Sequence, residues 1–238
     1  MSGEAHIAQA WKAFREGCEE AYRSLLEGDS AKLRDHNIVA DGDVELDFAL
    51  SLANVGAPGS GGAALDVGCG AGYLSGCLRR RRYAVTGIEI SEAAVTAARR
   101  QYPDLEFILG DATDPLRLVA GRQFDLICVR EFHPFTRIDE FDFQLRILTD
   151  YLSLLKSGGW LVLAHARRCE CLDYKRLLAY CRRAGLLTVG PTHMFLNKRL
   201  GVSSRRRVAT RLLSILSWIL SCATGHRWIE FLLLRPQR

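Results

Sequence analysis

Residues 65–73 read Leu65-Asp66-Val67-Gly68-Cys69-Gly70-Ala71-Gly72-Tyr73. The stretch begins within a short apolar run and ends where a helical pattern starts, so we predict a strand, a sharp turn and a helix. Glycines at alternate positions remove Cβ atoms where the chain turns, and they let a ligand approach the backbone. The spacing Gly-x-Gly-x-Gly differs from the Gly-x-Gly-x-x-Gly of a dinucleotide-binding loop. The stretch therefore predicts a ligand-binding turn and disfavours an NAD site.

Short apolar runs alternate with helical stretches from this turn onward. We expect strands at residues 63–67, 83–88, 105–109, 124–129, 160–165 and 186–190. We expect the helices between them at residues 73–82, 91–101, 139–155 and 171–184. Strands that alternate with helices of this length indicate βαβ units and a mostly parallel sheet. The predicted fold class is α/β, doubly wound, with its ligand beyond the carboxyl ends of the strands.

Acidic residues lie where these strands end. Asp66 stands two residues before the first glycine, and Glu89 closes the next strand in Gly87-Ile88-Glu89-Ile90-Ser91. A carboxylate in the position of Glu89 can accept both hydroxyls of a ribose. Asp111 follows the third strand in Gly110-Asp111-Ala112. The three acids are therefore expected at one edge of the sheet, around the glycine turn.

The order of these motifs resembles that of class I S-adenosylmethionine (SAM)-dependent methyltransferases. The glycine turn is similar to the first motif of the family, residues 88–91 to the second and residues 110–112 to the third. Phe124-Asp125-Leu126-Ile127 is similar to the start of the fourth strand. Leu155-Lys156-Ser157-Gly158-Gly159-Trp160-Leu161-Val162-Leu163 is similar to the start of the fifth. The resemblance thus runs in register from residue 65 to residue 163.

The resemblance implies a seven-stranded Rossmann-like sheet that binds SAM and releases S-adenosylhomocysteine (SAH). It implies that Asp66 organises the turn near the methionine amine of SAM and that Glu89 holds the ribose. Asp111 or its neighbouring backbone would contact the adenine amine. Three glycines would line the methionine and ribose: Gly68, Gly70 and Gly72. The sheet of the family ends in an antiparallel hairpin, and residues 228–236 are expected to form its last strand.

The loop after the fourth strand, residues 129–135, is where the acceptor is expected. His133 is the candidate general base for an oxygen acceptor, because imidazole titrates near neutral pH. The alternative is that His133 only caps a turn before a proline. Glu131 is expected to orient His133 or to bind the acceptor. Arg130 is assigned to the cofactor site, with a pairing to Glu131 as the alternative.

Further residues near the carboxyl ends of the strands bear on catalysis. His165 closes the fifth strand and is a second polar candidate near the same edge of the sheet. Cys169 and Cys171 lie near it, but their Cys-x-Cys spacing does not match the usual zinc pair, so no metal is expected. The loop after the fourth strand has no Asn/Asp-Pro-Pro-aromatic signature, which disfavours DNA amine methylation.

Charge divides the chain into unequal parts. Residues 167–238 contain 15 lysines and arginines against 3 acidic residues. A basic region of this kind suits an anionic partner or is simply a solvated face. Arg205-Arg206-Arg207 precede an apolar helical stretch, so residues 205–223 are expected either to contact an anionic membrane or to form a lid, a packed helix or a homodimer contact. We expect four regions: a helical lid or cap at 1–60, a SAM-binding core at 61–190, a basic helical insertion at 191–225 and the closing strand at 226–238.

These observations predict a SAM-dependent methyltransferase that acts on a small or lipid-linked acceptor, with oxygen as the favoured atom. The alternatives are an RNA methyltransferase that uses the basic third, and a SAM-binding regulator without turnover. No recognisable RNA-binding module is present, so nucleic acid is the less favoured partner. No basic-then-apolar leader begins the sequence and the cysteines lack disulfide spacing, so we expect a cytoplasmic protein, with peripheral membrane contact if residues 205–223 dock.

Overall fold

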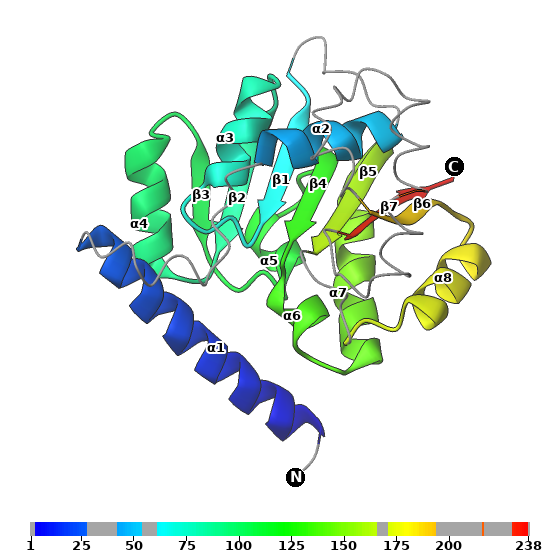
Figure 1. The fold of residues 1–238 in the computed structure, drawn as a ribbon, viewed down its shortest axis with the longest axis horizontal. Helices are drawn as coiled ribbons and strands as arrows, with labels where there is room; N and C mark the ends of the chain where they lie inside the picture. The colour runs from blue at the N-terminus through cyan, green and yellow to red at the C-terminus, as the bar shows by residue number, and fades with distance from the viewer. Residues whose placement is uncertain are drawn as a thin grey trace.

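The computed structural model describes residues 3–27, 42–53, 61–165, 171–193, 216 and 230–237. At its centre is a seven-stranded sheet in the order β3-β2-β1-β4-β5-β7-β6 (Figure 1). The strands are β1 Ala63–Val67, β2 Ala84–Glu89, β3 Glu106–Leu109, β4 Phe124–Arg130, β5 Leu155–His165, β6 Leu186–His193 and β7 Glu230–Pro236. The first five strands are parallel, and β7 is antiparallel to both β5 and β6. The predicted doubly wound sheet and its closing hairpin are confirmed.

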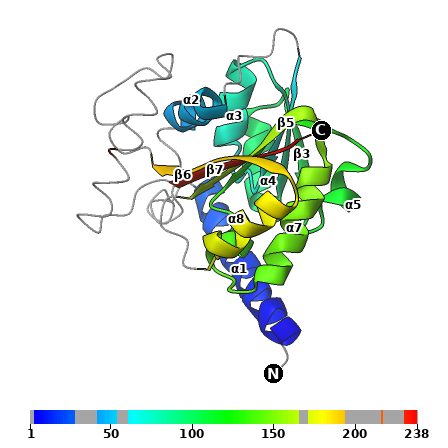
Figure 2. The same ribbon diagram turned by 90° about the vertical axis from the view of Figure 1, so that its right-hand side faces the viewer.

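Helices cover both faces of the sheet, as the end-on view in Figure 2 shows. One face carries α2 Gly42–Ala53, α3 Tyr73–Arg80 and α4 Glu92–Gln101. The other carries α5 Pro115–Val119, α6 His133–Thr136, α7 Phe141–Ser153 and α8 Tyr174–Arg183. The remaining helix, α1 Gly3–Leu26, lies apart from both layers, and its N-terminal end projects from the domain (Figure 1).

The alternation of side chains along the central strand explains the two layers. Leu65 and Val67 of β1 are fully buried in the cluster beneath α7, while Ala64 is buried in the cluster beneath α2 and α3. Successive strand residues point to opposite faces, so a strand with apolar residues on both faces must be covered on both sides. This arrangement leaves the carboxyl ends of the strands free for a site.

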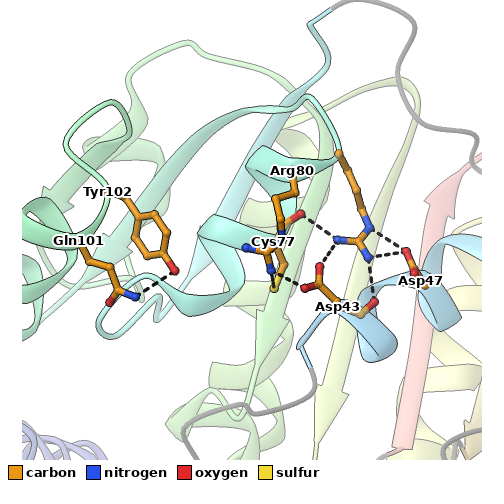
Figure 3. Close-up of polar contacts among 7 residues, drawn as sticks. Asp43, Asp47, Cys77, Arg80, Gln101 and Tyr102 are labelled. Carbon is orange, nitrogen blue, oxygen red and sulfur yellow. Dashed lines mark hydrogen bonds and ion pairs between the residues drawn. The ribbon is translucent and has the colours of Figure 1, made fainter.

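A network of ion pairs fastens α2 to the end of α3 (Figure 3). The guanidinium of Arg81 donates to Asp47 at 2.7 Å and to the backbone oxygen of Asp43 at 2.9 Å. Arg80 contacts Asp43 and also donates to the sulfur of Cys77 at 3.2 Å. The network fixes α2, the helix that carries Glu45, against the core.

Two features of the layout differ from the sequence-based predictions. β5 begins at Leu155 rather than Trp160, because Leu155 already pairs with Phe124 and a bulge follows before Trp160 pairs with Leu126. Gly158 and Gly159 lie in this bulge, which interrupts the strand pattern in the sequence. The predicted helix 139–155 is accordingly α7, which ends at Ser153. The short helices α5 and α6 were not predicted, since four or five residues show no periodicity.

Most of the predicted insertion at 191–225 lies outside the described residues. Its first three residues complete β6, and Leu216 is 49% exposed. Membrane contact through Arg205, Arg206 and Arg207 therefore stays a prediction. Within the described part of the chain, the helices are too short or too polar to cross a bilayer.

Candidate active site

A pocket of about 400 Å³ opens where β1, β2 and β4 end. Its walls come from the glycine turn, the loop after β4 and one side of α1. Most of the residues singled out from the sequence border it: Asp66, Gly68, Gly70, Glu89, Arg130, Glu131 and His133. Three do not border it: Gly72, which precedes α3, Asp111, whose neighbour Ala112 does, and His165 at the end of β5. The tertiary structure thus gathers side chains from three strand ends into one cavity.

The glycine turn has a backbone that other residues rarely adopt. Gly68, Gly70 and Gly72 have φ angles of 67°, 52° and 84°. The amides of Gly68 and Cys69 donate to the Ile88 carbonyl at 2.9 and 3.0 Å. A Cβ on Gly70 would lie 2.3 Å from the hydroxyl oxygen of Tyr22 in α1. Position 70 therefore requires glycine for its φ angle and for the close approach of Tyr22.

Glu89 organises the turn from the neighbouring strand. Its carboxylate accepts backbone N–H groups of Gly70 at 3.0 Å, Ile90 at 2.7 Å and Ser91 at 2.9 Å. Burial raises the pKa of Glu89, and these three hydrogen bonds oppose the rise. Because the carboxylate joins the end of β2 to the turn after β1, it sets the shape of the pocket floor.

Asp66 lies beneath the turn and is 2% exposed. It accepts a hydrogen bond of 2.6 Å from the Ser75 hydroxyl of α3. Burial raises the pKa of Asp66 to about 6, with the hydrogen bond from Ser75 opposing the rise and the charge of Glu89 adding to it. Two buried acids in one pocket favour a ligand that brings hydrogen-bond donors or a positive charge.

Helix α1 crosses the strand ends and touches them in succession. The indole nitrogen of Trp11 donates to Asp111 at 2.7 Å, beyond β3. Glu19 accepts from the Ser91 hydroxyl at 2.8 Å and from the Ala93 amide at 3.3 Å, beyond β2. Burial opposes ionisation of Glu19, but the hydrogen bonds from Ser91 and Ala93 and the nearby Arg23 hold its pKa below the ordinary value. Sequence reasoning missed Trp11, Glu19 and Tyr22 as site residues. The apolar residues of α1 recur at three- and four-residue intervals, which was a signal for Trp11 and Tyr22 but gave none for Glu19.

Arg130 is held by a residue that sequence reasoning did not identify. Its guanidinium pairs with Glu45 of α2 at 2.8 Å, and the side chains are 15% and 6% exposed. The sequence offered Glu131 as a partner of Arg130; the pair with Glu45 is an additional finding, and the pairing with Glu131 stays a prediction. The α2–α3 network holds α2 in place, and Glu45 of α2 in turn positions the charged guanidinium of Arg130 at the pocket wall.

Removing the charge of Glu45 should weaken the fold. We expect Glu45→Gln to lower the free energy of unfolding by about 1–2 kcal/mol, because Arg130 keeps its charge in a largely buried place. Urea denaturation measures the change. Glu16→Gln is the matched control, since Glu16 forms an exposed pair with Lys12 at 3.9 Å and should change stability little. Equal effects of the two variants would contradict a structural role for the Arg130 pair.

His133 begins α6 and stacks on α1. Its ring centroid lies 3.9 Å from that of Phe14, with 15° between the planes. Burial lowers the pKa of His133 to about 4, and the charge of Arg137 adds to the effect. Glu131, two residues before His133, has a φ of 51°, which is uncommon for a residue other than glycine. Because of its lowered pKa, the imidazole is neutral at pH 7 and is a weaker base than a free imidazole.

His165 lies at the end of β5 and is fully buried. It does not border the pocket, and among the described residues neither of its ring nitrogens has a hydrogen-bond partner. Burial lowers its pKa to about 4, and the charge of Arg130 adds to the effect. The structure thus gives His165 less access to a ligand than His133.

The lowered pKa of His133 predicts a pH dependence of stability. Between about pH 6.5 and pH 4 the unfolded chain binds a proton at this residue that the folded chain does not, so acidification favours unfolding. Asp66, whose pKa is raised, acts in the opposite direction, so the wild type alone does not isolate the effect. We expect the stability of the wild type relative to His133→Phe to fall between pH 7.5 and pH 4.5 in thermal unfolding. A difference that is constant across this range would contradict the burial of a neutral His133.

Within the described residues, histidine, cysteine and acidic side chains do not gather in groups of three suited to a metal. Cys169, which was weighed as a ligand, lies outside those residues.

Comparisons with known proteins agree with this geometry. Residues 64–159 match a family described as a methyltransferase domain. The chain is 32% identical over 133 residues to ribosomal RNA small subunit methyltransferase C of Alcanivorax borkumensis, covering 53% of this chain and 39% of that protein. It is 32% identical over 124 residues to a fatty-acid O-methyltransferase of Mycolicibacterium smegmatis, covering 48% of this chain and 41% of that protein. The chain therefore spans about two fifths of the length of these relatives.

Solved structures share the fold over nearly the whole chain. The plantazolicin methyltransferase BamL, in complex with a triazolic desmethylPZN analog and SAH, superposes with a TM-score of 0.61 at 14% identity. The similarity covers 98% of this chain and 99% of BamL. At this identity the likeness to BamL shows the shared fold, and the similarity to a methyltransferase domain family covers residues 64–159.

Proposed function

We propose that the protein binds SAM in this pocket and transfers its methyl group to an oxygen atom of a small acceptor. The observation that carries the proposal is the convergence of the glycine turn, Glu89 and His133 on one cavity. A carboxylate at the end of β2 suits ribose hydroxyls, and a neutral imidazole after β4 suits a hydroxyl proton.

In this proposal the turn and its two acids hold the cofactor. A ribose hydroxyl donates a hydrogen bond to Glu89. This bond adds to, or replaces, the hydrogen bonds that the carboxylate accepts from the three backbone amides. Asp66 supports the turn near the methionine amine, and Gly68 and Gly70 let the backbone approach the ligand. Ala112 of the pocket wall and the adjacent Asp111 stand toward the adenine, and the 2.7 Å hydrogen bond from the Trp11 indole holds Asp111 in place. Arg130, paired with Glu45, supplies a positive charge at the wall.

The proposed reaction is an in-line displacement at the sulfonium methyl. The carbon–sulfur bond breaks as the acceptor oxygen forms its bond to the methyl group, and the sulfonium becomes the thioether of SAH. The hydroxyl proton passes to the imidazole of His133, with Glu131 as a candidate to orient it. The cover that α1 forms over the strand ends excludes water from the reacting groups.

Two measurements test the proposal. Calorimetric titration with SAH tests the cofactor site, and incubation of the protein with methyl-labelled SAM and a cell extract tests turnover. Label in a metabolite or lipid supports the proposal, and label in RNA redirects it to the basic C-terminal third. Binding of SAH without any labelled product points to a regulator, and no binding of SAH contradicts the cofactor site itself.

A further inference from the structure

Four aromatic side chains form one wall of the pocket, which we call the aromatic wall. Trp11 and Phe14 come from α1, and Phe132 and His133 come from the loop after β4; all four border the cavity. The ring centroids of Trp11 and Phe14 are 5.3 Å apart with 28° between the planes. Phe14 in turn stacks on His133 at 3.9 Å. Two segments far apart in the sequence thus bring aromatic rings together at the border of one pocket.

The aromatic wall begins beside the proposed cofactor site. Phe132 reaches within 3.7 Å of the point that a Cβ on Gly68 would occupy. Phe132 is 6% exposed and packs edge-to-face on Phe135, with centroids 5.6 Å apart, so its ring is held in place. A molecule that rests on the wall therefore lies next to the turn that would hold the methionine part of SAM.

The aromatic wall itself carries no charged side chain, although charged residues border the same pocket elsewhere, Glu131 among them. The guanidinium of Arg130 is paired with Glu45, and Arg137 is exposed at the rim of the pocket. A charged acceptor would lose hydration against this surface without gaining an ion pair from the rings. An aromatic ring would gain stacking contacts in addition to burial of its surface, which a saturated ring of the same size would not.

We infer that Trp11 and Phe14 are specificity-determining residues that select an uncharged, planar aromatic alcohol as the methyl acceptor. This inference rests on the proposed function and names its substrate class. The hydroxyl oxygen of the acceptor attacks the methyl carbon of SAM, the carbon–sulfur bond breaks, and the hydroxyl proton goes to His133. Phe14 contacts the aromatic ring of the acceptor and takes no part in proton transfer.

Binding to the SAH-loaded protein tests the inference without requiring turnover. The probes are 2-naphthol and decahydro-2-naphthol, which share a carbon skeleton but differ in planarity and ring electrons. Calorimetry should show about tenfold tighter binding of 2-naphthol. Phe14→Leu keeps an apolar side chain with good helix propensity, and it should abolish most of this preference while changing SAH affinity less than about twofold. Arg15→Ala, at the adjacent exposed position of α1, is the control and should leave both affinities unchanged.

The outcomes separate this inference from the proposed function. Equal or tighter binding of the saturated probe overturns the inference, as does a preference that survives in Phe14→Leu. Either result leaves SAH binding and the methyltransferase proposal standing. Transfer of label to 2-naphthol by the wild type supports both, and binding of SAH with no affinity for 2-naphthol overturns only the inference. Failure to bind SAH overturns the proposed function and the inference together.

Discussion

Replacing His133 with alanine is expected to lower the rate of methyl transfer by about 10²- to 10⁴-fold, the usual contribution of a general base. The ring stands at the start of α6 on the pocket wall, where burial lowers its pKa to about 4. SAH affinity should change little, because the cofactor is assigned to the turn after β1 and to the end of β2. Single-turnover experiments with methyl-labelled SAM and its acceptor measure the rate of methyl transfer, and calorimetric titration measures the affinity for SAH.

A second variant distinguishes proton transfer from packing. His133→Phe keeps an aromatic ring for the stack on Phe14 but cannot accept a proton, so it should be as slow as His133→Ala. The wild-type rate should be independent of pH above about pH 6 and should fall as pH approaches 4, because protonation removes the base. Near-normal rates in His133→Phe would contradict the role of base and leave His133 as a packing residue.

Replacing Glu89 with alanine should have the next largest effect, on cofactor affinity. We expect SAH binding to weaken by about 1.5–3 kcal/mol, which is roughly 10- to 150-fold in Kd, because a charge-assisted contact to the ribose is lost. Calorimetric titration measures it. Three backbone amides also lose their acceptor, so stability should fall as well, and urea denaturation must show that the variant is folded.

The neighbouring acid Glu92 provides the control for Glu89. It is exposed in the first turn of α4 and does not border the pocket. Glu92→Gln should leave SAH affinity unchanged. If a folded Glu89→Ala binds SAH as tightly as the wild type, Glu89 is not a cofactor residue and its function is to shape the turn.

The sheet and the glycine turn could be predicted because their signals are local. The alternation of apolar runs and helical stretches predicted the strands, with β1 matching at both ends. Gly68 and Gly70 have positive φ angles, which glycine adopts readily, in agreement with the sharp turn that the glycines predicted. Glu89 was identifiable for the same reason, since parallel strands end at one edge and the acid closes the strand next to the turn.

The cover of the pocket was decided by the tertiary structure. The contacts of Trp11 with Asp111, Glu19 with Ser91 and Arg130 with Glu45 join residues 100, 72 and 85 positions apart. Periodicity showed that α1 has an apolar face, but a period of 3.6 residues contains no information on the surface that the face will meet. That surface forms only when four strand ends assemble at one edge. The sequence by itself therefore determined the strands, the turn and its acids, while packing across the finished sheet determined which side chains close the pocket.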